Sequence, residues 1–568
     1  MEDKEWEYKP QQSFFASPDT YHIAYERAKS LCLKSGLTVH DIVNLSPKFW
    51  DFHLDLTLTR DISALMIAQI HLNLCVGSIG AHVAATSRTD LDTLLEDLMS
   101  FRTCASFLLT EFGHGLDVKN METTATLLPD GSYDIHTPSP AAAKAMPPTT
   151  PLARCPRVAV VLAKLVVPQP DGSVDHRGFK LFLVPLASAH KMHPGVTAWM
   201  LPVRPGTTPL DHSLTSFRHV HLPPSALLGS PERATGDAGL DLHRQLWRVS
   251  VGAIALSLGN IACLRVASYI TGVYSKHRLV EKAGGKGKLV PIISFSTQYR
   301  PILQALVAAE VLGAYARWTT DLFSNDRNLD ILVRRGLAVV FKATVVHMFR
   351  VMPELADRCG WRGYYPHNQL ADLYLSYSAN AVAEGDVHVL SLRLAVELLS
   401  GRYTLPAAQD PNTLLARHES GLFSRLQGVA SDSSSFHGDS FNARGLPRCR
   451  QLIVAIGHRM AFEAAKSATI SAVSADVLGA FEAACVNEDP AWYVENLSYT
   501  QDQAQDMETA AYERLRPRLD ELLERTGARG YVTSPLVANE GEWAETVCNL
   551  PCFSTAGLEK ENATMAKM

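Results

Sequence analysis

The chain has no marked excess of charge of either sign and no cysteine spacing typical of a metal site. Its 568 residues include 53 Lys and Arg and 58 Asp and Glu, a formal net charge of -5. This balance gives no electrostatic reason to expect nucleic acid or an anionic membrane as the main partner. The ten cysteines are scattered, and only Cys548 and Cys552 lie close together. The sequence therefore predicts no zinc site, and reduced thiols in an intracellular compartment.

Long uninterrupted apolar runs are also missing. The longest apolar-rich stretch, residues 251–270, contains Asn260 and Arg265, so it is predicted to be a buried helix and not a membrane span. The acidic, polar start lacks the basic and apolar regions of a secretory signal. The last residues, Ala566, Lys567 and Met568, have the small–basic–hydrophobic form of a peroxisomal address. A peroxisomal location is therefore considered beside a cytoplasmic one.

What the chain does contain is apolar material for several cores. Hydrophobic residues make up 46% of it and charged residues 20%, which is ordinary for globular proteins. Apolar side chains at three- and four-residue steps indicate helices within residues 20–105 and over 243–273, 295–323, 329–351, 369–383 and 387–399. Short runs broken by Pro and Gly predict strands over 121–128, 132–137, 157–167, 179–186, 196–201 and 217–222.

These patterns predict an α+β fold that is mostly α. Residues 1–105 are expected to form an N-terminal helical domain and residues 106–235 a small antiparallel β-domain. A helical bundle is expected over 236–410 and an additional C-terminal helical extension over 411–568, with the polar run 431–440 as a link. The chain shows no internal repeat.

Two separated stretches carry residue types suited to chemistry. Residues 109–118 read LTEFGHGLDV and are followed at 122–126 by ETTAT. A Thr at a strand end before a Gly-rich turn can offer a hydroxyl and backbone N–H groups to a flat polar ring edge. The second stretch, residues 358–364, reads RCGWRGY, and Glu384, Gly385 and Asp386 follow a predicted helix.

Together these stretches resemble the signatures of the acyl-CoA oxidases and the related acyl-CoA dehydrogenases. The first is similar to T-E-x-G-H-G-x-[ND]-V with E-T-T-A-T, and the second to C-G-G-x-G-Y followed by E-G-D or E-G-T. Residues 194–197 and 217–229 resemble the strand and turn determinants of the same family. The resemblance extends from about residue 50 to about residue 405.

The resemblance implies a flavoenzyme that binds FAD and oxidises an acyl-CoA or an acyl-CoA-like substrate. Glu384 would be the base that removes the α proton while a β hydride passes to the flavin, and O2 would then take the electrons and give H2O2. A carboxylate in an apolar site suits this task because burial raises its pKa. The implied cofactor contacts are Thr110, Gly113, Gly115, Pro148, Thr149, Arg278, Gln298, Gly360, Gly363, Gly385 and Asp386.

The family pattern also implies a homodimer. Arg278, Gln298 and the turn from Gly360 to Gly363 would serve the FAD of the partner subunit, because Gly-rich N–H groups and an Arg suit a pyrophosphate. No metal is expected: His367, His388 and His418 lack ligand spacing with nearby carboxylates.

The sequence departs from the family at two places. Residues 144–149 read KAMPPT where oxidases have K-W-W-P-G-G, so both tryptophans are missing and Pro148 offers no N–H. Trp361 and Arg362 interrupt the small residues of the second stretch. Two alternatives therefore stay open. One is a repurposed flavoenzyme of a specialised biosynthetic pathway, acting on a substrate that is not a fatty acyl-CoA, and the other is a helical binding protein without flavin.

Three other features compete for a functional role. Glu419 lies beside His418 and a Gly turn, but its spacing from Cys359 is too long for the family base. His114 lies in the first stretch and is as suited to a structural turn as to a ligand contact. The basic loop 284–288 fits no phosphate-binding P-loop frame and is expected to be solvated.

Overall fold

The structure, a computed structural model, describes residues 15–233, 236–285, 287–325, 329–433, 435–467, 473–538, 546, 550–554 and 557–559. The chain divides into two compact units, each built from segments that are distant in sequence. Unit 1 comprises Met1–His53, Asp61–Leu256 and Ala383–Asp386, and unit 2 comprises Leu54–Arg60, Ser257–Val382 and Val387–Met568. The residues proposed from the sequence as a site are divided between the two. The four-part partition stays a prediction.

The N-terminal part of unit 1 is helical, as predicted. Its helices are α1 (Pro18–Ser35), α2 (Val39–Val43), α3 (Pro47–Leu54), α4 (Ile62–Gln69), α5 (Gly77–Thr86) and α6 (Asp92–Met99). Ser17 caps α1 by accepting a hydrogen bond from the N–H of Thr20, and Gly36 ends it in the left-handed conformation. A π-helical segment, Ile70–Val76, joins α4 to α5 and is almost wholly buried.

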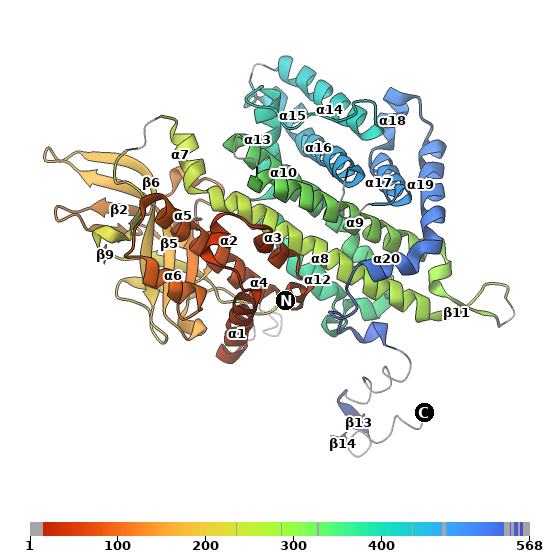
Figure 1. Cartoon of the computed structure of the whole chain (residues 1–568), viewed down its shortest axis with the longest axis horizontal. Coiled ribbons are helices and arrows are strands. Elements are labelled where there is room, and N and C mark those ends of the chain that lie inside the picture. Colours follow the sequence, from red (N-terminus) through yellow and green to blue (C-terminus); the bar gives the residue numbers. More distant parts are fainter. Residues whose placement is uncertain are drawn as a thin grey trace, which may run out of the picture. The chain divides into compact units, whose positions relative to one another are not determined.

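Unit 1 also contains a seven-stranded sheet and a three-stranded sheet (Figure 1). The larger has the order β10-β6-β5-β2-β3-β9, with β1 also paired to β5. Its strands are β1 (Cys104–Leu108), β2 (Thr124–Leu127), β3 (Tyr133–His136), β5 (Arg157–Pro168), β6 (Val174–Ala187), β9 (Val220–Leu222) and β10 (Leu227–Leu228). The smaller has the order β4-β8-β7, formed by Lys144–Pro148, His212–Phe217 and Val196–Met200.

Strand β5 decides how the larger sheet is built. Residues 157–161 of β5 pair in parallel with β1, and residues 164–166 pair in parallel with β2. The sheet is therefore mixed, whereas short strands between turn residues had suggested antiparallel pairing throughout. The predicted strand over 217–222 also divides, because β8 ends at Phe217 and β9 begins at Val220. Buried Val161, Phe182 and Leu222 belong to the core of this region.

Unit 2 is a helical assembly. Its first α-helix is the larger, C-terminal part of α8 (Trp247–His277), which begins in unit 1 after α7 (Ala238–Gln245). The others are α9 (Ser296–Asn325), α10 (Ile331–Met348), α11 (Met352–Asp357), α12 (Leu370–Ser378), α13 (Val387–Leu399), α14 (Leu414–Ser431), α15 (Asp439–Arg444), α16 (Leu446–Lys466), α17 (Ala475–Glu488), α18 (Pro490–Leu497), α19 (Gln501–Leu515) and α20 (Leu519–Arg525). Two small hairpins pair β11 (Leu279–Glu281) with β12 (Leu289–Pro291), and β13 (Cys552–Ser554) with β14 (Gly557–Glu559).

Helices α9, α10, α16 and α17 pack against one another in unit 2 (Figure 1). The predicted helices over 295–323 and 387–399 match α9 and α13 closely. The predicted helix over 369–383 ends earlier, at Ser378, because the chain passes through a 3-10 turn at Ala379–Ala381 and then into left-handed backbone. The mostly α, α+β fold class is confirmed.

Two helical stretches, Ile62–Thr86 and Trp247–His277, have the length and apolar composition that a membrane crossing requires. In each of them 83% of the most apolar window is buried inside the structure. Core helices of globular proteins have the same character, so these stretches are weak evidence for a membrane span.

Candidate active site

Glu384 lies in a tight break between α12 and α13. Its φ angle is 55° and that of Gly385 is 93°, so two successive residues adopt the left-handed region. This conformation is uncommon for a residue with a β-carbon, and it persists where the surrounding structure enforces it. The break presents the Glu384 side chain from a turn, and Asp386 leads into α13.

The Glu384 carboxyl group packs directly on helix α8. A β-carbon built on Gly252 would lie 2.5 Å from Oε1 and 2.6 Å from Cδ of Glu384. Any larger residue at this position would force the carboxyl group to move, since real β-carbons do not come so close to other atoms. Val251 and Ile254 of the same helix are buried, while Glu384 keeps part of its surface exposed. Unit 1 thus holds a carboxylate in a fixed, partly buried place.

The loop that contains Thr110 projects from one edge of β5. Because β1 pairs with residues 157–161 and β2 with residues 164–166, residues 109–123 form an excursion between two strands on the same edge. The carbonyl of Thr110 accepts a 2.8 Å hydrogen bond from the N–H of Ala145. The Thr110 side chain is partly exposed, so its hydroxyl stands at a point whose backbone is fixed.

The two glycines of this loop differ in what surrounds them. The Gly113 N–H donates to the carbonyl of Ala141 at 2.7 Å, and a β-carbon on Gly113 would lie 2.7 Å from that of Ala141. Gly113 therefore allows close packing, and its N–H is not the open donor that the sequence suggested. Nothing lies within 4 Å of a β-carbon built on Gly115, which is exposed.

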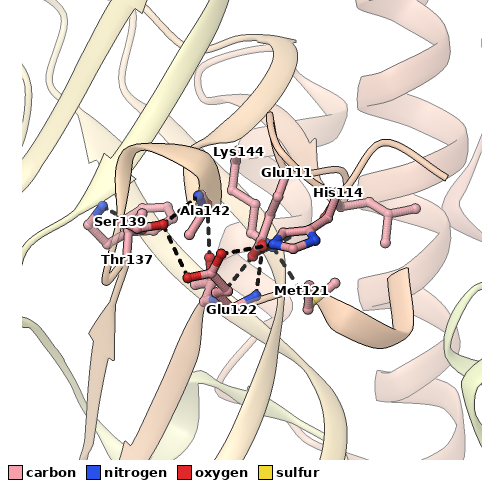
Figure 2. Close-up of polar contacts among 11 residues, drawn as sticks. Glu111, His114, Met121, Glu122, Thr137, Ser139, Ala142 and Lys144 are labelled. Atoms are coloured by element: carbon pink, nitrogen blue, oxygen red, sulfur yellow. Dashed lines mark hydrogen bonds and ion pairs between the residues drawn. The ribbon is translucent and has the colours of Figure 1, made fainter. Parts of the chain in front are cut away.

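A buried ion pair that the sequence reasoning missed anchors the loop (Figure 2). Lys144 Nζ lies 3.2 Å from Glu111 Oε1, and both side chains are fully buried. Glu111 also accepts hydrogen bonds from the N–H groups of Glu122, at 2.7 Å, and Thr123, at 2.9 Å. The sequence carries no signal for this pair, because positions 111 and 144 are too far apart to be paired by inspection.

Burial and charge act in opposite directions on this pair. Burial lowers the pKa of Lys144 to about 8, although Glu111 partly offsets the effect. Burial alone would raise the pKa of Glu111, but the Lys144 charge and the two backbone N–H groups outweigh it and lower the pKa. The pair is thus held by its hydrogen bonds as well as by attraction.

His114 belongs to a polar cluster around Glu122. Its Nε2 lies 2.8 Å from Glu122 Oε1, and the Ser139 hydroxyl donates to Glu122 Oε2 at 3.1 Å (Figure 2). The interactions of His114 explain its position as a turn residue that connects the Thr110 loop to the 137–142 segment. Of the two roles considered for it, the structural one has direct support here.

Strand β4 is irregular where the family pattern has its tryptophans. Its register with β8 shifts between Ala145 and Pro148, and Met146 has a φ angle of 81°. The carbonyl of Pro148 accepts hydrogen bonds from Ser106 and Arg157. Pro148 therefore contributes an internal acceptor to the fold.

The hydroxyl of Thr149 also bonds inside unit 1. Its Oγ1 lies 2.7 Å from Oγ1 of Thr215, and the residue is fully buried. The direct flavin contact proposed for Thr149 gains no support from this placement.

Three large apolar side chains are exposed on these hydrogen-bonded segments. Phe112 is 66% exposed, Leu116 61% and Met146 49%. Phe112 and the β4 segment are joined, because the Phe112 N–H donates to the carbonyl of Ala143 at 2.8 Å. Exposed apolar surface beside the Thr110 hydroxyl fits a flat heterocycle that is apolar on its faces and polar at its edge.

In unit 2 the structure brings Gln298 to the second family stretch. Gln298 Nε2 donates to the carbonyl of Arg358 at 2.9 Å and to the hydroxyl of Ser275 at 2.8 Å. Gly363 packs on α11, because a β-carbon there would lie 2.1 Å from the carbonyl oxygen of Ala356. Gly360 has a φ angle of 61° and open space beside it.

The turn after Gly360 exposes an aromatic surface. Trp361 is 65% exposed, Tyr364 57% and Tyr365 51%, and the Arg362 guanidinium lies 5.6 Å from the Trp361 ring centre. Arg278, one residue beyond the end of α8, is exposed, and its guanidinium makes no hydrogen bond or ion pair with the residues that the structure describes. The exposed Trp361 ring and the Arg278 guanidinium are available to a ligand or to another subunit.

Glu419, the other carboxylate considered, is committed to a structural ion pair. Arg459 Nε lies 2.6 Å from its Oε2 and Arg459 Nη2 lies 3.1 Å from its Oε1. Arg459 also bonds to Glu463 at 2.9 Å. Burial raises the pKa of Glu419, with Arg459 opposing. Glu419 lines a cavity of about 600 Å³, but a carboxylate with both oxygens on one guanidinium is poorly suited to take a proton from a substrate.

Comparison with known proteins points to one family of enzymes. No family model matches the chain. It is 27% identical over 322 residues to peroxisomal acyl-coenzyme A oxidase 1 of Arabidopsis thaliana, covering 53% of this chain and 47% of the relative. It is 26% identical over 313 residues to peroxisomal acyl-coenzyme A oxidase 2 of Oryctolagus cuniculus, covering 52% and 45%. The chain spans about half the length of the curated relatives it matches.

Solved structures match over nearly the whole chain. Acyl-CoA oxidase 1 of Yarrowia lipolytica has a TM-score of 0.77 at 18% identity and covers 96% of this chain and 88% of its own. An acyl-CoA oxidase-1 of Caenorhabditis elegans, complexed with FAD and ATP, has a TM-score of 0.69 at 17% identity and covers 93% and 92%. The chain thus has the acyl-CoA oxidase fold, and the resemblance seen in the sequence is confirmed.

Proposed function

We propose that this chain, which has the fold of the acyl-CoA oxidases, is an FAD-dependent oxidoreductase that forms a double bond between the α and β carbons of an acyl-CoA or a related thioester. The observation that carries the proposal is the placement of Glu384. Its left-handed backbone and its packing against Gly252 hold the carboxylate in a fixed, partly buried position. Such constraint on a single acidic side chain is typical of a residue that performs chemistry.

Glu384 would act as the general base. A carboxylate oxygen would accept the proton from the carbon next to the thioester carbonyl. Because the carboxylate is already held in place, less entropy would be lost in reaching the reactive geometry. When bound, FAD would supply the redox chemistry by accepting the hydride from the β carbon. The thioester would leave with a new carbon–carbon double bond, and the proton would remain on Glu384.

The residues of the Thr110 loop fit one end of such a cofactor. The Thr110 hydroxyl would bond to the polar edge of the ring system, and Phe112 and Met146 would contact its apolar surface. Gly115 leaves open space beside the loop. In unit 2 the uncommitted guanidinium of Arg278 suits a pyrophosphate.

Three finer statements belong to the same proposal. Homodimerisation is supported by the exposed Trp361 and Tyr364 beside Gly360, where the family pattern implies contact with the FAD of the partner subunit. O2 as electron acceptor with H2O2 as product is supported by the oxidase names of the relatives. A peroxisomal location is supported by the same names; Ala566, Lys567 and Met568 lie outside the described residues.

The proposal is tested with purified full-length protein. We expect flavin absorbance in the visible range and bleaching of that absorbance when acyl-CoAs are added without oxygen. The Glu384→Gln variant should bind flavin but reduce it at least about 100-fold more slowly, because loss of a general base has effects of this order. Glu495→Gln, an exposed residue of α18, is the matched control. Equal rates in Glu384→Gln and the parent protein would remove Glu384 as the base.

A second candidate function rests on strand β4. The left-handed Met146 and the two prolines after it reshape the segment where the family pattern has Trp-Trp-Pro-Gly. A reshaped wall favours a substrate other than a straight fatty acyl chain, as in a repurposed enzyme of a specialised pathway. Flavin reduction by aromatic or branched acyl thioesters, with none by straight-chain ones, would favour this candidate. A colourless protein that takes up no FAD would favour the flavin-free binding protein.

A further inference from the structure

Three metal-ligating side chains from three helices of unit 2 lie together, and none of them is among the residues proposed for the active site. His347 lies in the last turn of α10, His458 within α16, and Glu488 at the end of α17. One ligand atom from each of them lies within 4.8 Å of the other two. His347 Nε2 is 2.6 Å from Glu488 Oε2, and His458 Nε2 is 3.8 Å from the same oxygen.

His458 supplies a second, independent observation. It is 3% exposed, and its Nε2 has no hydrogen-bond partner among the described residues. Buried polar atoms are almost always hydrogen-bonded, so an unpartnered ring nitrogen is an exception that needs a reason. Its nearest charged neighbour is Glu488, and the rings of His347 and His458 lie 5.6 Å apart between centres. The nitrogen therefore faces the other two ligand atoms.

The helix ends around the cluster suit a cation. The C-terminal ends of α10 and α17 add partial negative charge, with Arg350 as the opposing positive group.

We propose that His347, His458 and Glu488 bind one divalent transition-metal ion, with Zn²⁺ as the best fit. Two imidazole nitrogens and one carboxylate oxygen form a donor set that Zn²⁺ uses, with a further position open to water. Tetrahedral Zn²⁺ places its ligand atoms roughly 3.3 Å apart. The 2.6 Å contact would open slightly and the 3.8 Å contact would close slightly. Glu488 is exposed and gives the ion a route from solvent.

The ion would crosslink helices α10, α16 and α17 of unit 2. The site contains none of the residues proposed for flavin or thioester, so it stands independently of the proposed function. Because the ion binds the folded chain, it would raise the unfolding temperature. The sequence predicted no metal, because its ligands come from positions 347, 458 and 488 and show no recognisable spacing.

The test uses the full-length protein after treatment with EDTA. Titration with Co²⁺, followed by its visible absorption, and competition with Zn²⁺ should show one site per chain. Glu488→Gln and His458→Gln should each weaken binding at least about tenfold, which is the lower end of the loss seen even for indirect changes around metal sites. His437→Gln, an exposed histidine outside the cluster, should bind like the parent. Zn²⁺ should raise the unfolding temperature of the parent and of His437→Gln only.

Two outcomes would overturn the proposal. One is the absence of saturable Co²⁺ or Zn²⁺ binding to the parent protein. The other is binding by Glu488→Gln with the affinity of the parent, which would assign the metal to other groups such as the cysteines. The Glu488→Gln variant is the decisive one, because the Glu488 side chain is at the surface. His458 is buried, and its replacement can disturb folding.

Discussion

The Glu384 carboxyl group packs against the α-carbon of Gly252. A β-carbon on residue 252 would lie only 2.5 Å from Oε1 of Glu384. The two residues are far apart in sequence, and the helix α8 supplies one of them and the break before α13 the other. A glycine in the middle of a helix is unfavourable by roughly 0.5–1 kcal/mol relative to alanine. Its presence here is explained by the carboxyl group that it accommodates.

The Gly252→Ala variant should therefore separate activity from stability. The new methyl group would displace the carboxyl group, and a displacement of about 1 Å can lower a rate roughly 100-fold. We expect slower flavin reduction by acyl-CoA with an unfolding temperature that stays close to that of the parent. Gly428→Ala in α14, where nothing lies within 4 Å of the new atom, is the control and should keep the parent rate. An unchanged rate in Gly252→Ala would argue against Glu384 as the base.

The Thr110 loop offers a matched pair of glycines. Gly113→Ala would bring a β-carbon to 2.7 Å from that of Ala141 and push the loop away, whereas Gly115→Ala meets nothing within 4 Å. Flavin affinity, measured by fluorescence titration of the apoprotein, should fall severalfold or more in Gly113→Ala and stay near the parent value in Gly115→Ala. Equal affinity in the two variants would show that this loop does not position the cofactor.

The Glu111–Lys144 pair should behave as a unit in a double-mutant cycle. Glu111→Gln leaves a buried ammonium group without its partner and should lower the free energy of unfolding by about 3–5 kcal/mol. Lys144→Met should likewise destabilise, and the double variant should lose clearly less than the sum of the two. Chemical denaturation of the four proteins measures this, and additive losses would contradict a direct interaction.

The same pair predicts a pH dependence. Because the folded pKa of Glu111 lies below its ordinary value of 4.5, the unfolded chain takes up the proton first as the pH falls. The stabilisation from Glu111 is thus present above about pH 4.5 and is lost as the pH falls through the folded value. The stability difference between the parent and the Glu111→Gln variant should shrink below this pH in denaturation experiments. A constant difference would show that the pKa of Glu111 is the same in the folded and the unfolded chain.

The aromatic turn tests the proposed dimer. Large exposed aromatic side chains often carry much of the binding energy of an interface. Trp361→Ala should raise the dissociation constant of the homodimer roughly tenfold or more, a loss of about 1.4 kcal/mol. Analytical ultracentrifugation over a range of concentrations measures it, with Val494→Ala, another exposed apolar residue, as the control. A parent protein that sediments as a monomer would refute the dimer itself.

Local patterns determined much of the fold. Helical periodicity identified α9 and α13, because apolar residues recur every three to four positions along the buried face of an amphipathic helix. The family signatures around Thr110 and Glu384 were also readable, because each is a continuous stretch whose turns need particular residues. The roles given to these residues stay predictions.

Only the tertiary structure decided what surrounds those residues. No spacing rule in the sequence connects the residues that meet in these contacts. They are the packing of Glu384 on Gly252, the ion pair of Glu111 with Lys144, and the cluster of His347, His458 and Glu488. Strand pairing and helix packing bring such positions together, and β1 and β2 could share one edge of β5 only once the chain had folded. The order of residues sets the local conformation and the available chemistry, whereas contacts between distant segments set which groups meet.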